Sequence, residues 1–170
     1  VEEFEGTKFY SELCQALREI AHVEELAVYT LAQFEQVMVV RSVTEDYPGE
    51  LKHRSIDVDV NKAPIVIREQ AERAIGLHSA GGCVANVLLI HRGRMIGMAC
   101  AIAEKASELE EIRKALTEAA PTAAKAIHAE MERESRTRRV RELELLYEIS
   151  SLSSGAISAT SLAGRVAREM

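Results

Sequence analysis

His78, Cys83 and His91 are side chains that can bind a metal ion or react with electrophiles, and they lie close together in the sequence. A zinc or redox site requires such side chains to converge in space. A complete strand is expected between Cys83 and His91, and Cys83 forms no CxxC spacing with Cys14 or Cys100. We therefore interpret them as a loop histidine, a buried thiol and a turn histidine, and expect no metal site.

Three polar residues within apolar segments are candidates for binding a small molecule. Asn86 interrupts an apolar strand and could place an amide at the floor of a pocket, although a hydrogen-bonded buried amide or an outward position is the alternative. Arg41 could bind an anion or could be a solvated strand residue. Tyr29 could line the pocket or could be a core tyrosine with its hydroxyl group at the edge.

Composition narrows the classes of function. The chain has 170 residues, 47% of them hydrophobic and 28% charged, which is a globular balance. The net charge of −6 argues against nucleic acid as a partner, and no apolar run is long enough to span a bilayer. The sequence contains no GxSxG, P-loop or HExxH motif, so we expect no catalysis. The odd number of cysteines favours a reducing, cytoplasmic compartment.

Hydrophobic periodicity predicts the elements that position these residues. The first helix has an apolar face made of Phe9, Leu13, Ala16, Leu17 and Ile20. We then expect strands at 26–31, 37–43 and 55–60, a helix at 61–76, a hairpin with strands 83–90 and 95–103, and a long helical pattern from 109 that Pro121 kinks or splits. Residues 65–67 would also suit a strand, and 150–160 is predicted to be a linker before another helix.

This order predicts an α+β fold, with an antiparallel sheet of five to six strands, helices packed on it and a long C-terminal helix. The terminal helix is longer than one such sheet can cover, so we expect a homodimer in which a second copy covers its apolar stripe. The stripe consists of Ile127, Met131, Leu143, Leu146 and Ile149. The segment 132–141 carries five Arg and two Glu, which we interpret as a solvated helix rather than a basic nucleic-acid-binding region.

The hairpin sequence CVANVLLIHRGRMIGMACA resembles the central hairpin of GAF domains, with Gly93, Ile96 and Gly97 matching the family pattern. Leu88 stands where the family usually has Pro. The resemblance covers about Phe9 to Glu134 and includes the helix before the first strand and the helix after the hairpin. The chain lacks the Asn-Lys-Phe-Asp/Glu signature of cyclic-nucleotide GAF domains and the Cys-His pair that attaches bilins.

The resemblance implies a GAF-like sensory domain at 1–134, a signalling helix at 135–153, and a linker with the start of a further domain at 154–170, so the sequence is expected to be part of a longer chain. It implies a non-catalytic sensory and dimerisation module of a signal-transduction protein. The alternative is a purely structural dimerisation domain with no small ligand. A ligand of unknown identity is expected under the segment 61–82, small and mostly apolar, with Tyr29, Arg41, His78, Cys83 and Asn86 as its contacts.

Overall fold

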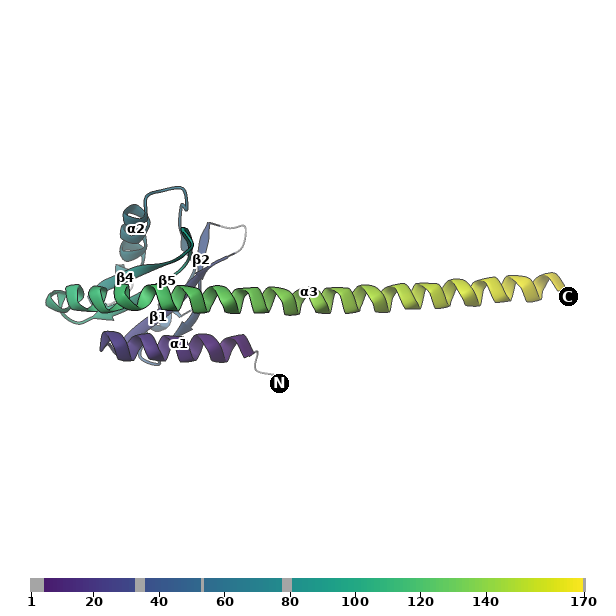
Figure 1. Ribbon diagram of the computed structural model, residues 1–170, viewed down its shortest axis with the longest axis horizontal. Coiled ribbons are helices and arrows are strands. Elements are labelled where there is room, and N and C mark those ends of the chain that lie inside the picture. The colour runs from purple at the N-terminus through teal and green to yellow at the C-terminus, as the bar shows by residue number, and fades with distance from the viewer. Residues whose placement is uncertain (1–4, 33–35, 53, 78–80, 170) are drawn as a thin grey trace. The chain divides into compact units, whose positions relative to one another are not determined.

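The computed structural model describes residues 5–32, 36–52, 54–77 and 81–169, and the side chains of these residues between 8 and 152. Figure 1 labels the principal elements. In chain order they are α1 (Glu5–Ala21), β1 (Glu25–Leu31), β2 (Val37–Val43), β3 (Ile56–Asp57), α2 (Pro64–Gly76), β4 (Cys83–His91), β5 (Arg94–Ala103) and α3 (Leu109–Glu169). Short 3-10 helices, η1 (Gly49–Leu51) and η2 (Ala106–Glu108), precede β3 and α3.

The chain divides into two compact units, residues 1–130 and 131–170. The first unit contains the sheet, α1, α2 and the part of α3 up to Glu130. The second unit consists of the rest of α3.

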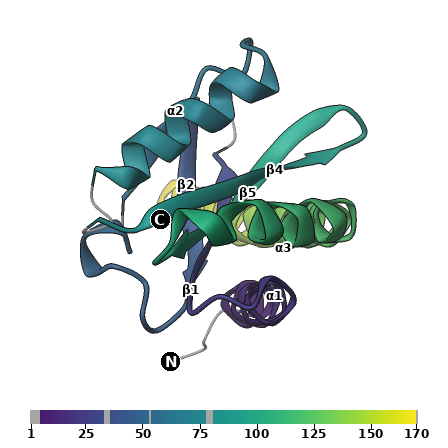
Figure 2. The same ribbon diagram turned by 90° about the vertical axis from the view of Figure 1, so that its left-hand side faces the viewer.

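The five strands form one antiparallel sheet in the order β3-β2-β1-β5-β4. Figures 1 and 2 show α1 and the first part of α3 side by side on one face of this sheet, with α2 on the opposite face. The predicted α+β fold class is therefore confirmed. The arrangement follows from the hairpin β4–β5, whose nearly continuous apolar sequence must be covered on both faces.

The β4–β5 hairpin turns through two residues, Arg92 and Gly93. Both have positive φ angles, 51° and 75°. A two-residue turn with two positive φ angles matches the right-handed twist of the flanking strands, which is why glycine is favoured at such a position. The predicted hairpin is correct, with each strand one residue longer at the turn.

The core between the sheet and α2 is apolar except for a few hydroxyl, thiol and amide groups. Its buried members from the strands and the loop before β3 are Ala27, Tyr29, Met38, Tyr47, Leu51, Ile56, Val58, Met98, Cys100 and Ile102. From α2 come Ile67, Ala71 and Ile75, one helical turn apart, so that one stripe of α2 lies against the sheet.

The third strand is much shorter than predicted. Only Ile56 and Asp57 pair with β2, whereas alternation predicted a strand over 55–60. The chain turns immediately afterwards, because the Asp59 carboxylate accepts a hydrogen bond from the Asn61 amide. Val58 is buried, but Val60 is exposed.

The predicted face of α1 is also wrong. The buried row is Tyr10, Cys14, Leu17 and Ala21, whereas Phe9 and Leu13 are half-buried and Ile20 is 49% exposed. Only Leu17 belongs to both sets. The Cys14 thiol lies 3.5 Å from the Leu26 carbonyl oxygen, which holds this row against β1. An apolar row on α1 therefore remains at the surface.

The helices also differ from expectation at their ends. Helix α2 begins at Pro64 rather than at Asn61, with Ala63 as its N-cap residue. Helix α3 is neither split at Pro121 nor interrupted by a linker at 150–160, because it is assigned continuously to Glu169. Proline removes one helical hydrogen bond, and the buried contacts of Leu116 and Ala124 on either side offset that loss.

Gly97 lies where β5 passes closest to β1. A Cβ atom at this position would collide with the carbonyl oxygen of Tyr29 and would touch Thr30. Because both partners are backbone atoms in the centre of the sheet, neither can move aside without disturbing the β1–β5 pairing.

We therefore expect Gly97→Ala to lower the free energy of unfolding by about 1–3 kcal/mol, as overpacking does in a rigid core. Gly76→Ala is the matched control, because nothing lies within 4 Å of a Cβ there, and it should leave the stability unchanged or raise it by up to about 1 kcal/mol. Urea denaturation of both variants measures this. Equal stabilities for the two variants would contradict the close approach.

Candidate functional site

A hydrogen-bonded group of side chains is buried between the sheet and α2. The Tyr29 and Tyr47 hydroxyl oxygens lie 3.2 Å apart, and the Cys100 thiol interacts with Tyr47. Burial raises the pKa of both tyrosines above the usual value and raises the pKa of the Cys100 thiol to about 12. All three groups are therefore neutral near pH 7, and Cys100 is not an activated nucleophile.

Asn86 lies on the same face of the sheet and is fully buried. Its amide nitrogen donates to the Arg68 carbonyl oxygen of α2 at 3.2 Å and lies 3.2 Å from the Met98 sulfur. Its carbonyl oxygen, Oδ1, is buried without a hydrogen-bond partner. An unsatisfied buried acceptor reduces the stability of the folded state.

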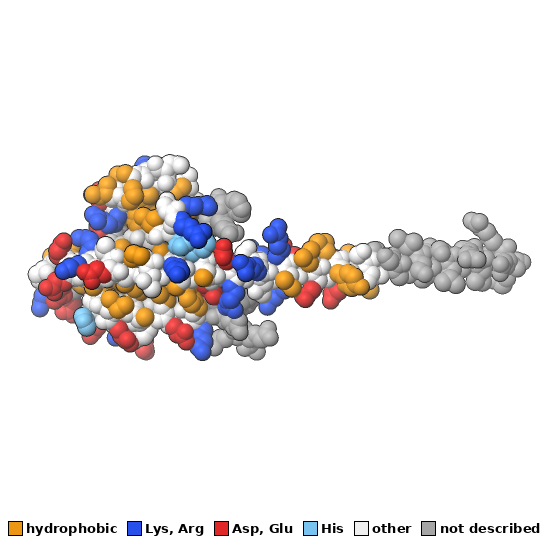
Figure 3. Space-filling model, viewed as in Figure 1, with side chains coloured by type: hydrophobic (Ala, Val, Ile, Leu, Met, Phe, Trp, Pro, Cys, Tyr) orange, Lys and Arg blue, Asp and Glu red, His pale blue; other side chains and the backbone are white. Residues whose placement is uncertain are grey.

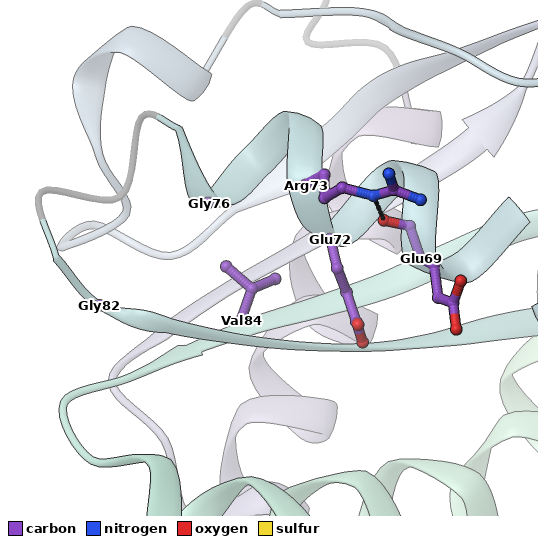
Figure 4. A pocket seen from close by; sticks show the side chains of 6 residues that line it. All are labelled: Glu69, Glu72, Arg73, Gly76, Gly82 and Val84. Carbon is purple, nitrogen blue, oxygen red and sulfur yellow. Dashed lines mark hydrogen bonds between the residues drawn. The ribbon is translucent and has the colours of Figure 1, made fainter. Parts of the chain in front are cut away.

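An open cleft of about 370 Å³ separates the C-terminal half of α2 from the start of β4. It is lined by Glu69, Glu72, Arg73, Gly76, Gly82 and Val84, which Figure 4 shows from close by. Arg73 folds back on its own helix, where Nε donates to the Glu69 carbonyl oxygen at 3.3 Å. With three charged side chains at its wall, the cleft suits a small polar molecule rather than the mostly apolar ligand that we expected.

The five predicted ligand contacts do not form one site. Tyr29 and Asn86 both lie in the core under α2, but Arg41 lies on the other side of the sheet. Its guanidinium group is 4.3 Å from the centre of the Tyr10 ring of α1. The cause is a bulge in the β1–β2 pairing between Val28 and Tyr29, opposite Arg41, which shifts the alternation of β2 by one residue.

Cys83 and His91 stand at opposite ends of β4, so they do not converge, and His78 lies outside the described residues. Cys83 is half-buried rather than buried. The His91 ring instead packs on the His128 ring of α3, with the ring centres 4.6 Å apart. Strand β4 therefore contacts α2 through Asn86 and α3 through His91.

The predicted dimer stripe divides between the two units. Ile127 is 0% exposed and belongs to the core of the first unit, so its assignment to a dimer contact is wrong. Met131, at the start of the second unit, is half-buried. Leu143, Leu146 and Ile149 are each 62% exposed.

Tyr47 and Glu72 are site residues that our sequence interpretation missed. Tyr47 belongs to an Asp-Tyr-Pro-Gly turn, and a large aromatic residue in an otherwise polar turn was the available signal. Glu72 has no such signal, because its neighbour across space is Arg113, 41 residues away in the sequence.

Among the described residues, no group of three or more His, Cys, Asp or Glu side chains is placed to hold a metal ion. Across the same residues, no helix has the length and apolar character needed to cross a membrane.

No protein-family model matches the sequence, and no curated protein matches it. Among solved structures, the chain is similar to the second GAF domain of DevS from Mycobacterium smegmatis, with 18% identity, a TM-score of 0.49 and coverage of 78% of this chain and 97% of that one. It is also similar to a GAF domain/HD domain protein from Geobacter sulfurreducens, with 14% identity, a TM-score of 0.48 and coverage of 74% and 93%.

A third similar structure is the blue-light absorbing form of the PixJ GAF domain from Thermosynechococcus elongatus, with 13% identity, a TM-score of 0.43 and coverage of 81% of this chain and 94% of that one. The names of all three structures include a GAF domain.

The unsatisfied oxygen of Asn86 leads to a stability prediction. Asn86→Leu removes the buried acceptor and keeps the number of side-chain heavy atoms, so we expect the free energy of unfolding to rise by about 1 kcal/mol. Asn86→Ala is the control for lost volume and should lower it by about 1–2 kcal/mol. Urea denaturation measures both. Leucine also removes the hydrogen bond to the Arg68 carbonyl oxygen, so a leucine variant less stable than the native chain would contradict the expectation that the unsatisfied acceptor outweighs that bond.

Proposed function

We propose that this chain is a non-catalytic sensory and dimerisation module of a signal-transduction protein. A small molecule or partner binds at the α2 side of the sheet, and its presence is relayed through α3 to an effector domain downstream in the same polypeptide. The observation that carries the proposal is the cleft between α2 and β4, because it lies on the face opposite the helical layer of α1 and α3.

Strand β4 supports the relay. It forms one wall of the cleft at Val84, bonds to α2 through Asn86, and ends at His91 against α3. A shift of α2 caused by a bound molecule therefore acts on a strand that is also in contact with the terminal helix. Coupling of this kind requires a continuous physical connection whose arrangement both ends can bias.

The α1 and α3 layer offers an apolar surface to a second copy. Figure 3 faces this layer and shows hydrophobic side chains between rows of charged ones over α1 and the adjoining part of α3. On α1 the surface includes Phe9, Leu13 and Ile20, the row that our sequence interpretation placed in the core. Exposed apolar patches of this kind mark contact sites between proteins.

The second unit adds a larger apolar surface. Seven large apolar side chains between Val140 and Leu152 are 54–77% exposed. They are Val140, Leu143, Leu145, Leu146, Tyr147, Ile149 and Leu152. At 100° per residue they cover roughly 240° of the helix circumference, more than the roughly 100° stripe of one helix seam. A second copy can therefore pair with this helix in more than one rotation, which suits a helix that switches between two packings.

The second candidate function is a structural dimerisation domain without a small ligand. The filled core beneath α2 favours it, because Tyr29, Tyr47 and Met98 are fully buried there and occupy the space that a deep pocket would need. The two candidates differ in ligand binding and agree on dimerisation.

A thermal-shift screen separates the two candidates, since a ligand that prefers the folded state must raise its stability. We expect at least one small polar compound to raise the melting temperature of the native chain. That rise should be lost in Glu69→Gln, which alters the cleft. Arg41→Gln, on the other sheet face, should retain it. If no compound in a broad metabolite library shifts the native chain, the structural candidate replaces the sensory one.

Dimerisation is tested by sedimentation equilibrium. The native chain should be a dimer, and Leu143→Glu combined with Leu146→Glu and Ile149→Glu should raise the dissociation constant at least about 100-fold, because each buried leucine or isoleucine is worth roughly 1.5–3 kcal/mol. Glu144→Lys is the control on the polar side of the same helix and should remain dimeric. A native chain that is monomeric at high concentration would contradict the dimer.

A further inference from the structure

The Glu72 side chain takes part in both the cleft and an ion pair with α3. Its side chain lines the cleft between α2 and β4, and Figure 4 shows it extending from α2 past β4. Its Oε1 atom accepts a hydrogen bond from the Arg113 Nη2 atom of α3 at 3.0 Å. Because α2 and α3 lie on opposite faces of the sheet, this ion pair joins the two faces around the sheet edge.

The surroundings of the pair make it stronger than an ordinary surface contact. The Glu72 and Arg113 side chains are only 22% and 25% exposed. By contrast, Lys8–Glu12 and Arg136–Glu132 join residues of one helix at 3.7 Å, and all four of those side chains are more than half exposed. Solvent and salt screen exposed pairs effectively, so that they contribute little, whereas partly buried pairs are screened less.

Arg113 depends mainly on Glu72 for its position. Its second acidic neighbour, Glu110, is 3.7 Å away and 92% exposed. Its Nε atom is buried without a hydrogen-bond partner. Because Nε has no partner, the acceptors of the other guanidinium nitrogens hold Arg113 in place. Removal of Glu72 therefore leaves a partly buried donor group with only the exposed Glu110 as a partner.

The pair also lies across the exposed edge of the sheet. Strand β4 has a largely apolar sequence and is an outer strand of the sheet that the described residues form. Charged side chains commonly protect such an edge. A substitution or movement of Glu72 therefore alters the contacts of three regions: the cleft, the edge of β4 and the first turns of α3.

We propose that the Glu72–Arg113 ion pair is the switch through which occupation of the cleft reaches α3, and that the activating ligand carries an ammonium or guanidinium group. This inference rests on the proposed sensory function. A cation bound in the cleft competes with Arg113 for the Glu72 carboxylate, and Glu69, which lines the same cleft, supplies a second acidic contact. Release of Arg113 then loosens the start of α3.

Hydrogen exchange of the ligand-free chain tests the switch without any knowledge of the ligand. The variants are Glu72→Gln, Arg113→Gln and the double substitution. Each single variant should raise amide exchange in residues 113–124 about threefold, the effect of losing a partly buried pair. The double variant should add little to either one, because both singles break the same interaction. Glu110→Gln is the control that removes the exposed neighbour of Arg113, and it should leave exchange unchanged.

Unfolding by urea, measured on the same variants, separates a local effect on α3 from a loss of global stability. Exchange in α3 that is identical in the native chain and Glu72→Gln would overturn the switch. So would additive effects in the double variant. Either result would leave the thermal-shift test of the sensory function standing, so failure of the switch is distinct from failure of the function.

The cationic class is tested with agmatine, which carries both an ammonium and a guanidinium group. Millimolar agmatine should raise exchange in residues 113–124 of the native chain and should have no effect on Glu72→Gln. n-Butanol, which lacks a charged group, is the control probe. No response of the native chain to agmatine, or an equal response in Glu72→Gln, would overturn the assignment of a cationic ligand.

Discussion

The architecture of the first unit depends on one constraint: the hairpin β4–β5 is apolar on both faces. Leu89 and Ala101 are buried on one face of the sheet. Met98 and Cys100 are buried on the other face. Burial of apolar surface is the dominant stabilising contribution to folding, so both faces must be covered. Helices α1 and α3 cover one face and α2 covers the other. The two faces thereby acquire different characters: one keeps an apolar row of α1 at its surface, and the other is bordered by a cleft.

Because α2 and α3 cover opposite faces of the sheet, the relay that we propose passes either through the sheet or around its edge. Asn86 and His91 connect β4 to the helices on the two faces, and the Glu72–Arg113 pair passes around the edge. The neutral cluster of Tyr29, Tyr47 and Cys100 fills the core beneath α2.

Local sequence signals predicted the elements that depend on local physics. The strand at 37–43 and the turn at Arg92–Gly93 follow from β-branched residues and from the conformational freedom of glycine. The errors arose where tertiary contacts decide. Arg41 lies on the sheet face opposite to the one we expected, because of a bulge that no local pattern reveals. Ile127 is buried because α3 still lies on the sheet at that point. The Glu72–Arg113 pair depends on the sheet order, which periodicity does not specify.

Amide chemical shifts, measured by NMR during titration with the first compound found to raise the melting temperature, test the sensory account most directly. The account predicts that residues 69–76 of α2 and residues 113–124 of α3 shift together, with the same apparent dissociation constant, because one binding event biases both helices. Shifts confined to α2 would show binding without relay. Chemical-shift changes in α1 and α3 without any change at the residues that line the cleft would contradict the account.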